Sequence, residues 1–381
     1  MNTENAMRYP DFLKPNGKIG FVAPSFGCAT EPYISYFDNA QRILRDKGYG
    51  LTLGPNCYVE KGIGISNSPD KCGAELNEMY AGSECDVIIS CGGGEMMCEV
   101  VPYIDFDLIG KSRPKWYMGY SDNTNFTFLS ATLSDTAAIY GPCAAAFGME
   151  PWHKAIQDAL SVITGTGLND DSFTFNGYDR WEYRNNKEDA MPFAPYNTTE
   201  ASRIISLTNG VIGDYEENVG LSWTGHDEEP IVIRRPVSTG DITMSGRLIG
   251  GCLDCLVHLV GTPYDRVSEF ADRYASDGIL WFLEACDLNP MDIRRSMWQI
   301  KEAGWFKNVS GFMIGRTGKF GEEIMGLDNY RAVVDIISQY GVPVLLDADI
   351  GHHPPMLPVI CGSYTTVTTS GNNYSVTMRL S

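Results

Sequence analysis

The sequence predicts an α/β protein of two domains that meet at a cleft, and three observations lead to this fold class. The chain has 381 residues, which is more than one domain usually holds. Residues 1–150 alternate short apolar segments with amphipathic ones, the βαβ pattern of a parallel sheet. A second alternating set occupies residues 231–381. Between them, residues 151–230 are rich in Gly, Asn, Asp and aromatic side chains, which indicates a linker with a mobile insertion.

The N-terminal domain is expected to form an open, doubly wound sheet. Strands are predicted where short apolar runs end at turn residues, and helices where apolar residues recur with the helical period. The predicted strands cover residues 18–24, 86–91, 115–120 and 137–141, and the predicted helices cover residues 31–49, 69–81 and a segment from about Thr124. In such a sheet, ligands bind at the carboxyl ends of the strands.

The C-terminal domain is expected to be α/β or α+β. Its predicted elements are strands at 231–236, 278–285, 309–316 and 342–351, a strand and helix within 243–262, and helices near 290–304 and 327–340. The chain ends on YTTVTTSGNNYSVTMRL, in which two alternating runs flank Gly-Asn-Asn. This pattern predicts an antiparallel hairpin.

Composition and charge exclude several classes of function. Hydrophobic residues make up 43% and charged residues 20% of the chain, as in an ordinary globular protein. The 29 basic residues against 48 acidic ones give a net charge of −19, which argues against nucleic acid and membrane partners. The sequence shows no signal peptide and no apolar stretch long enough for a membrane span. We therefore expect a cytoplasmic protein.

The cysteines indicate reduced, buried thiols. There are eleven of them at irregular spacing, and several lie within apolar runs. One Cys-x-x-Cys pair, Cys252 and Cys255, has neither a second pair nor a suitably spaced histidine to complete a zinc site. Its helix-like context favours a packing role, and we expect no metal ion.

A serine follows one of the predicted strands directly. In MGYSDNTNFTFL (118–129), an apolar strand ends at Gly119 and turns at once into a helix, with Ser121 at the turn. A serine placed there presents its hydroxyl at the carboxyl edge of the sheet, where backbone N–H groups of the helix start can receive an oxyanion. Asn123 stands where the motif G-x-S-x-G has its last glycine. A helix-capping role for this serine is the alternative.

Three further features lie at strand ends. SCGGGEMM (90–97) is a glycine turn that lets a ligand approach the backbone, or a turn chosen only for its backbone angles. ILWFLEACD (279–287) is an apolar strand whose first acidic residue is Glu284, either a catalytic carboxylate or a solvated strand end. VPVLLDADIGHHPPMLP (342–358) carries two of the five histidines, His352 and His353, on a proline-rich loop. Histidine is the usual base at neutral pH.

Taken together, these features resemble the LD-carboxypeptidase family of serine peptidases, which also contains the microcin C immunity peptidases. The resemblance covers nearly the whole chain. It rests on IGFVAPS (19–25), Gly93 and Gly94 followed by VPYIDFDLI (101–109), GYSD (119–122), GRLIGGCLDCL (246–256), GTPY (261–264), WFLE (281–284), and GH followed by LP (351–358).

The resemblance implies a Rossmann-like N-terminal domain that carries the nucleophile, a C-terminal domain that carries the other two catalytic residues, and a homodimer. The matching positions are Ser121 for the nucleophile, Glu284 for the orienting carboxylate and His352 for the base, since His352 directly follows glycine as the motif requires. The role of the adjacent His353 stays open. The implied oxyanion donors are the backbone N–H groups of Asp122 and Gly94, and no organic cofactor is needed.

The resemblance is less specific about the substrate than about the catalytic residues. Cleavage of murein peptides by an acyl-enzyme mechanism is the family-level function, and hydrolysis of aminoacyl-nucleotide amides, as in the microcin C immunity branch, is the alternative. Gly92 and Glu99 replace residues typical of many murein-trimming members, which favours that branch. Gly93 and Trp181 are candidate substrate contacts, the latter by stacking. A non-catalytic nucleotide- or sugar-binding protein is the rival from another class.

Overall fold

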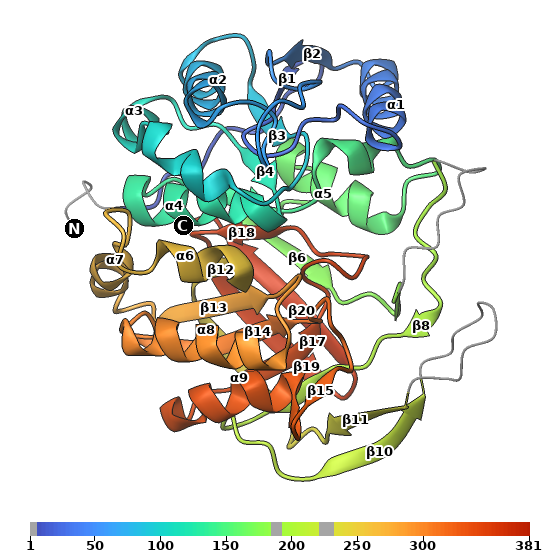
Figure 1. Cartoon of the computed structure of the whole chain (residues 1–381), viewed down its shortest axis with the longest axis vertical. Coiled ribbons are helices and arrows are strands. Elements are labelled where there is room, and N and C mark those ends of the chain that lie inside the picture. Colours follow the sequence, from blue (N-terminus) through green and yellow to red (C-terminus); the bar gives the residue numbers. More distant parts are fainter. Residues whose placement is uncertain (1–5, 184–192, 221–231) are drawn as a thin grey trace.

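A computed structural model describes residues 6–183, 193–220 and 232–381, and within them the strands form two large sheets. The sheet of the N-terminal half lies above the sheet of the C-terminal half in Figure 1, with helices packed around both. One apolar core runs through both sheets, and a smaller core lies on the far side of the first. The predicted α/β class, with a sheet in each half, is confirmed.

The first sheet has the order β18-β5-β4-β3-β1-β2, and its strands are parallel except for β18. The elements of this half are β1 (Lys18–Val22), α1 (Tyr33–Asp46), β2 (Gly50–Leu53), α2 (Pro69–Ala81), β3 (Val87–Ser90), α3 (Phe106–Lys111), β4 (Tyr117–Gly119), α4 (Thr124–Ser134), β5 (Ala138–Tyr140) and α5 (Lys154–Thr164).

Strands of this sheet are apolar on both faces, because each face is covered. In β1, Ile19 and Phe21 belong to the main core, whereas Val22 belongs to the smaller core on the opposite face. In β3, Ile89 belongs to the main core and Ile88 to the smaller core. This explains why the predicted strands read as continuous apolar runs rather than as alternating ones.

The second sheet is mixed, with the order β6-β20-β19-β12-β13-β14-β17-β9. Strands β12, β13, β14 and β17 are parallel, and antiparallel strands extend both sides. The elements of this half are β6 (Ser172–Asn176), β9 (Ile205–Leu207), β12 (Thr243–Cys252), α6 (Leu253–Leu259), α7 (Val267–Arg273), β13 (Ile279–Glu284), α8 (Pro290–Glu302), β14 (Val309–Gly315), α9 (Asn329–Ile337), β17 (Val344–Ala348), β18 (Val359–Cys361), β19 (Tyr364–Ser370) and β20 (Asn373–Arg379). Three two-stranded ribbons are β7 (Arg180–Trp181) with β8 (Glu200–Ala201), β10 (Tyr215–Gly220) with β11 (Val232–Pro236), and β15 (Glu323–Ile324) with β16 (Leu327–Asp328).

Local signals explain where several elements begin and end. Helix α8 starts at Asn289-Pro290, and the Asn289 side chain accepts hydrogen bonds from two N–H groups of the first turn. Strands β19 and β20 pair up to Ser370 and Asn373, so the predicted terminal hairpin is present with Gly371 at its turn.

The structure differs from the expected domain division in two places. Strands β6 and β9 lie within residues 151–230, yet they form the two edges of the second sheet. Strand β18 comes from the C-terminal third, yet it completes the first sheet beside β5. Local periodicity does not reveal which sheet a short strand joins. Within the expected insertion, residues 184–192 and 221–230 lie outside the described residues.

The two sheets bring several strand ends to one place. Strand β4 ends just before Ser121, and β13 ends on Glu284, which is paired with Cys252 at the end of β12. Strand β17 leads into the loop that carries His352. Helix α4 of the first half packs against β12 of the second half, which holds the strand ends together. Among the described helices, none is long and apolar enough to cross a membrane.

Candidate active site

The structure brings Ser121, His352 and Glu284 together, although they come from distant parts of the sequence. The Ser121 Oγ lies 2.9 Å from His352 Nε2, and His352 Nδ1 lies 2.8 Å from Glu284 Oε2. Both distances are those of hydrogen bonds. The serine hydroxyl therefore donates to the imidazole, whose other N–H donates to the carboxylate.

The backbone at the serine is strained, as expected of a sharp strand-to-helix turn. Ser121 has φ of +61°, in the left-handed region that side chains other than glycine rarely adopt. Its N–H donates to the Tyr140 hydroxyl at 3.1 Å. The Asn123 side chain donates to the carbonyl of Gly92 at 2.8 Å and so ties this turn to the glycine turn. Asn123 thus stabilises the turn where the motif G-x-S-x-G has glycine.

Glu284 is only 2% exposed and is held from three sides. The Tyr140 hydroxyl donates to its Oε1 at 2.6 Å, while His352 donates to its Oε2. Gly351 has φ of +102°, and a Cβ there would lie 2.5 Å from Glu284 Oε2. The glycine before the histidine is therefore required, because any side chain would displace the carboxylate.

The histidine and the glutamate shift each other's pKa. Burial alone disfavours the charged imidazole, but the adjacent Glu284 carboxylate outweighs it and raises the pKa of His352 well above its ordinary value. Burial alone would raise the pKa of Glu284, yet His352 and the hydrogen bonds lower it. The carboxylate therefore stays ionised and stabilises a proton on the imidazole.

The glycine turn lies directly against the serine. A Cβ at Gly93 would lie 3.1 Å from Ser121 Oγ, and a Cβ at Gly94 would lie 2.0 Å from the Ser25 hydroxyl. That hydroxyl donates to the buried Asp122 carboxylate at 2.5 Å. Backbone groups of the turn are thus close to the nucleophile. The oxyanion roles of the Asp122 and Gly94 N–H groups stay predictions.

His353 and Trp181 pack against each other, with ring centroids 5.1 Å apart. The His353 Nε2–H donates to the carbonyl of Thr317 at 2.9 Å, and burial, together with the charge of Arg316, lowers the pKa of His353 to about 4. Trp181 is 2% exposed and packs edge-on against His353 and Phe320. The sequence indicated an open stacking surface at Trp181. The structure instead buries the indole under side chains from two distant segments.

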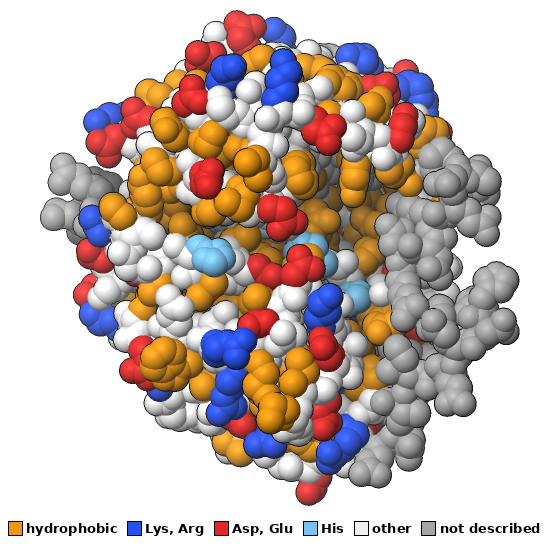
Figure 2. Space-filling view, viewed as in Figure 1, with side chains coloured by type: hydrophobic (Ala, Val, Ile, Leu, Met, Phe, Trp, Pro, Cys, Tyr) orange, Lys and Arg blue, Asp and Glu red, His pale blue; other side chains and the backbone are white. Residues whose placement is uncertain are grey.

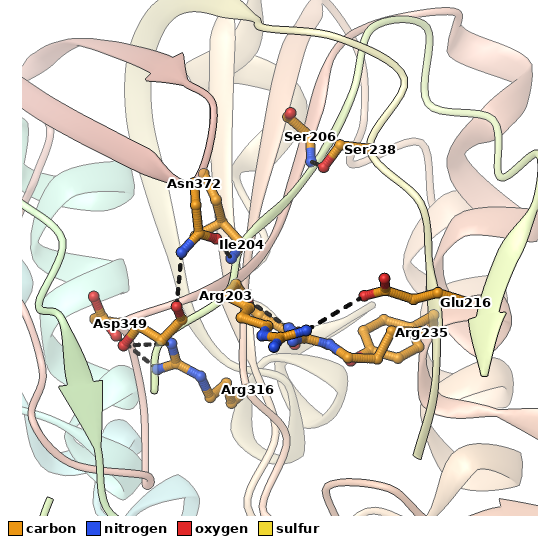
Figure 3. A network of polar contacts seen from close by, with 12 residues as sticks. Arg203, Ile204, Ser206, Glu216, Arg235, Ser238, Arg316, Asp349 and Asn372 are labelled. Carbon is orange, nitrogen blue, oxygen red and sulfur yellow. Dashed lines mark hydrogen bonds and ion pairs between the residues drawn. The ribbon is translucent and has the colours of Figure 1, made fainter. Parts of the chain in front are cut away.

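A buried ion pair supports the loop that carries His352. Figure 3 shows Arg316 pointing toward Asp349, and its Nη1 lies 2.6 Å from the Asp349 Oδ1. Both side chains are almost fully buried, at 2% and 0% exposed. Asp349 also accepts a hydrogen bond from the Tyr374 hydroxyl, and its carbonyl accepts one from the N–H of Leu357 at the far end of the loop. Trp181 covers the Arg316 guanidinium at 4.9 Å.

Replacing Arg316 with Met is expected to destabilise the fold by about 3–5 kcal/mol, because it leaves the Asp349 carboxylate buried without a counter-charge. Urea denaturation would measure the free energy of unfolding, with Arg331→Met as a matched control, since Arg331 is half exposed. Equal midpoints for the two variants would show that the buried pair does not support the fold.

A cavity of about 380 Å³ opens at Ser121. The cavity lies between the glycine turn, the start of α6 and the segment after β13. Figure 2 shows acidic side chains and histidines side by side at mid-height of the face in view. Cys252, Glu284 and His352 have ligand atoms within 4.8 Å of one another, close enough to hold a metal ion. The last two, however, already hydrogen-bond to each other.

Sequence reasoning missed two residues of the site. Tyr140 joins the serine backbone to Glu284, but its strand reads as an ordinary core strand. Asp254 lines the cavity beside the Cys252–Cys255 pair. Its position in the first turn of α6 is the signal that could have found it.

Comparison with known proteins finds relatives that match nearly the whole chain. The chain is 24% identical to a "probable murein peptide carboxypeptidase" of Bacillus subtilis (95% of this chain, 92% of the relative) and 24% identical to the microcin C7 self-immunity protein MccF of Escherichia coli (94% and 92%). Its fold matches a MccF-like protein of Bacillus anthracis (TM-score 0.72, 21% identity, 98% and 99% covered) and MccF in complex with aspartyl sulfamoyl adenosine (TM-score 0.72, 20% identity, 97% and 98% covered).

Two family profiles match most of the described sheets. That of the LD-carboxypeptidase N-terminal domain matches residues 19–141, and that of the LD-carboxypeptidase C-terminal domain matches residues 245–367. Ser121 lies in the first match, and Glu284 and His352 lie in the second. Because the two matches together cover more than half of its length, the chain belongs to the LD-carboxypeptidase family.

Proposed function

We propose that the chain is a serine hydrolase of the LD-carboxypeptidase type, which cleaves an amide bond through an acyl-enzyme on Ser121. The observation that carries this proposal is the chain of hydrogen bonds from Ser121 through His352 to Glu284, at 2.9 and 2.8 Å. A serine next to an imidazole that a buried carboxylate orients is the arrangement used for nucleophilic acyl transfer.

In the proposed mechanism, His352 Nε2 takes the hydroxyl proton as Ser121 Oγ attacks the substrate carbonyl. Glu284 holds the imidazole in the tautomer with Nδ1–H and stabilises its charged form. The backbone N–H groups of Asp122 and Gly94 receive the oxyanion. His352 then protonates the leaving amine, and water attacks the acyl-enzyme by the same route and regenerates Ser121.

The proposed substrate is a murein-type peptide that ends in D-Ala. The Bacillus subtilis relative is named a "probable murein peptide carboxypeptidase", whereas a solved structure of MccF holds aspartyl sulfamoyl adenosine. Several carboxylates line the cavity at Ser121, which disfavours an aspartyl group or a phosphate there. Hydrolysis of aminoacyl-nucleotide amides is the second candidate. The homodimeric state and the cytoplasmic location stay predictions.

A direct substrate comparison tests the proposal. Wild-type protein and the Ser121→Ala variant would be incubated with a murein tetrapeptide that ends in L-Lys-D-Ala and with aspartyl sulfamoyl adenosine, and the products measured by mass spectrometry. We expect release of D-Ala by the wild type alone. Cleavage of the nucleotide analogue alone would select the second candidate. Tight binding of either compound without cleavage would indicate the non-catalytic binding protein.

A further inference from the structure

The hydrogen bonds of the three candidate catalytic residues close into a ring through Tyr140. The Ser121 hydroxyl donates to His352 Nε2 at 2.9 Å, and His352 Nδ1–H donates to Glu284 Oε2 at 2.8 Å. The Tyr140 hydroxyl donates to the other oxygen of the Glu284 carboxylate at 2.6 Å and accepts from the Ser121 N–H at 3.1 Å. One connected set of hydrogen bonds therefore holds Ser121 at both its side chain and its backbone.

Tyr140 lies between the two halves of the molecule and is fixed by both. It belongs to β5, in register with Gly119 at the end of β4, and its side chain is fully buried. Its ring packs against Phe282 of β13, with centroids 5.3 Å apart. Strand β4 leads into the turn of the nucleophile, and β13 ends on Glu284. Tyr140 therefore joins the nucleophile of the first half to the carboxylate of the second.

The direction of each hydrogen bond at Tyr140 follows from its protonation. Burial, together with the charge of Glu284, raises the pKa of Tyr140 well above its ordinary value, so the hydroxyl keeps its proton. A phenol has a single O–H proton. Because this proton is donated to Glu284, the phenol oxygen accepts from the Ser121 N–H. Burial raises the pKa of Glu284, and the bond from Tyr140 acts with His352 to lower it.

We propose that Tyr140 is a positioning residue, which keeps the turn of the nucleophile aligned with Glu284 and limits how strongly this carboxylate attracts the imidazole proton. The first role follows from the strained backbone of Ser121, whose φ of +61° persists only where the surroundings hold it. The second follows from the shared carboxylate, because hydrogen bonds to one group polarise each other. The inference rests on the proposed function, since it describes how Ser121 and His352 stay aligned for attack.

Tyr140→Phe tests the proposal on the intact protein, because this change removes the hydroxyl and keeps the ring. The rate at which a fluorophosphonate labels Ser121 measures the reactivity of the nucleophile without a known substrate. We expect Tyr140→Phe to be labelled at least about tenfold more slowly than the wild type. The matched control is Tyr274→Phe, which removes a hydroxyl that donates to the carboxylate of Asp135 at 3.2 Å. It should be labelled at the wild-type rate.

The pH dependence of labelling separates positioning from a merely structural contribution. Labelling requires the unprotonated imidazole, so its rate falls as pH drops through the pKa of His352. Without the hydroxyl, Glu284 attracts the imidazole proton more strongly, and the acidic limb of Tyr140→Phe should move to higher pH. The variants leave unchanged the other titratable groups that act on Glu284 or His352 or face them, which are the Cys252 and Cys286 thiols and Glu95.

A tyrosine fluorinated next to its hydroxyl, placed at Tyr140, covers the case in which Tyr140→Phe does not fold. Its hydroxyl is a stronger donor to Glu284, so the acidic limb should move to lower pH. Wild-type labelling rates in Tyr140→Phe, or an acidic limb that stays in place in the fluorinated protein, would overturn the positioning role and leave the serine hydrolase intact. Failure of the wild type to be labelled at Ser121 would instead overturn the proposed function, and this inference with it.

Discussion

Replacing Ser121 with Ala is expected to lower kcat by at least about 10³-fold, because the change removes the nucleophile. Folding should persist. The side chain belongs to neither apolar core, and its hydrogen bond to His352 contributes on the order of 1 kcal/mol. Steady-state rates on the cleaved peptide and thermal unfolding of the same samples would measure both effects.

A matched control is Ser83→Ala, which makes the same chemical change at an exposed serine. This variant should keep full activity. A Ser121→Ala protein that folds and retains more than about a tenth of the wild-type rate would show that Ser121 is not the nucleophile.

Replacing Glu284 with Gln should lower kcat less than the loss of the nucleophile does, by on the order of 10⁴-fold, and should also change the pH dependence. The Glu284 carboxylate raises the pKa of His352, and catalysis requires the unprotonated imidazole. In the wild type, kcat/KM therefore falls as pH drops through this raised pKa. Without the carboxylate, the pKa of His352 falls, so the acidic limb of the pH profile should move to lower pH.

Profiles of kcat/KM against pH for the wild type, Glu284→Gln and Glu99→Gln would test this shift. Glu99 is exposed and outside the cavity, so its variant should reproduce the wild-type limb. An acidic limb that stays in place in Glu284→Gln, or that moves to higher pH, would contradict the orienting role of this carboxylate.

The sequence predicts much of the fold because most strands and helices carry local signals. The predicted helix at 69–81 is α2, and the predicted strand at 86–91 contains β3. Pairing between distant strands carries no such signal. Strand β6 has the sequence SFTFN, whose alternating burial fits an edge strand of either sheet. Its place beside β20 depends on contacts that only the complete fold brings together.

The candidate site, like the fold, could be predicted from the sequence only in part. The residues themselves placed Ser121, Glu284 and His352 at strand ends, but each had an ordinary alternative, and only the family resemblance joined them. Tyr140 and Asp254 were not predicted as site residues, because a tyrosine in an apolar strand and an aspartate at the start of a helix look like packing and capping residues. Their importance follows from distances to residues far away in the sequence, such as the 2.6 Å between Tyr140 and Glu284.

Fluorophosphonate labelling followed by peptide mapping tests the central claim most directly, because it requires no knowledge of the substrate. The reagent phosphonylates a serine that an adjacent imidazole activates. We expect one adduct on the wild-type protein, located at Ser121, present in Ser83→Ala and absent in Ser121→Ala and His352→Ala. A protein without any adduct, or with its adduct at another serine, would contradict the assignment of Ser121 and His352 as the reacting pair.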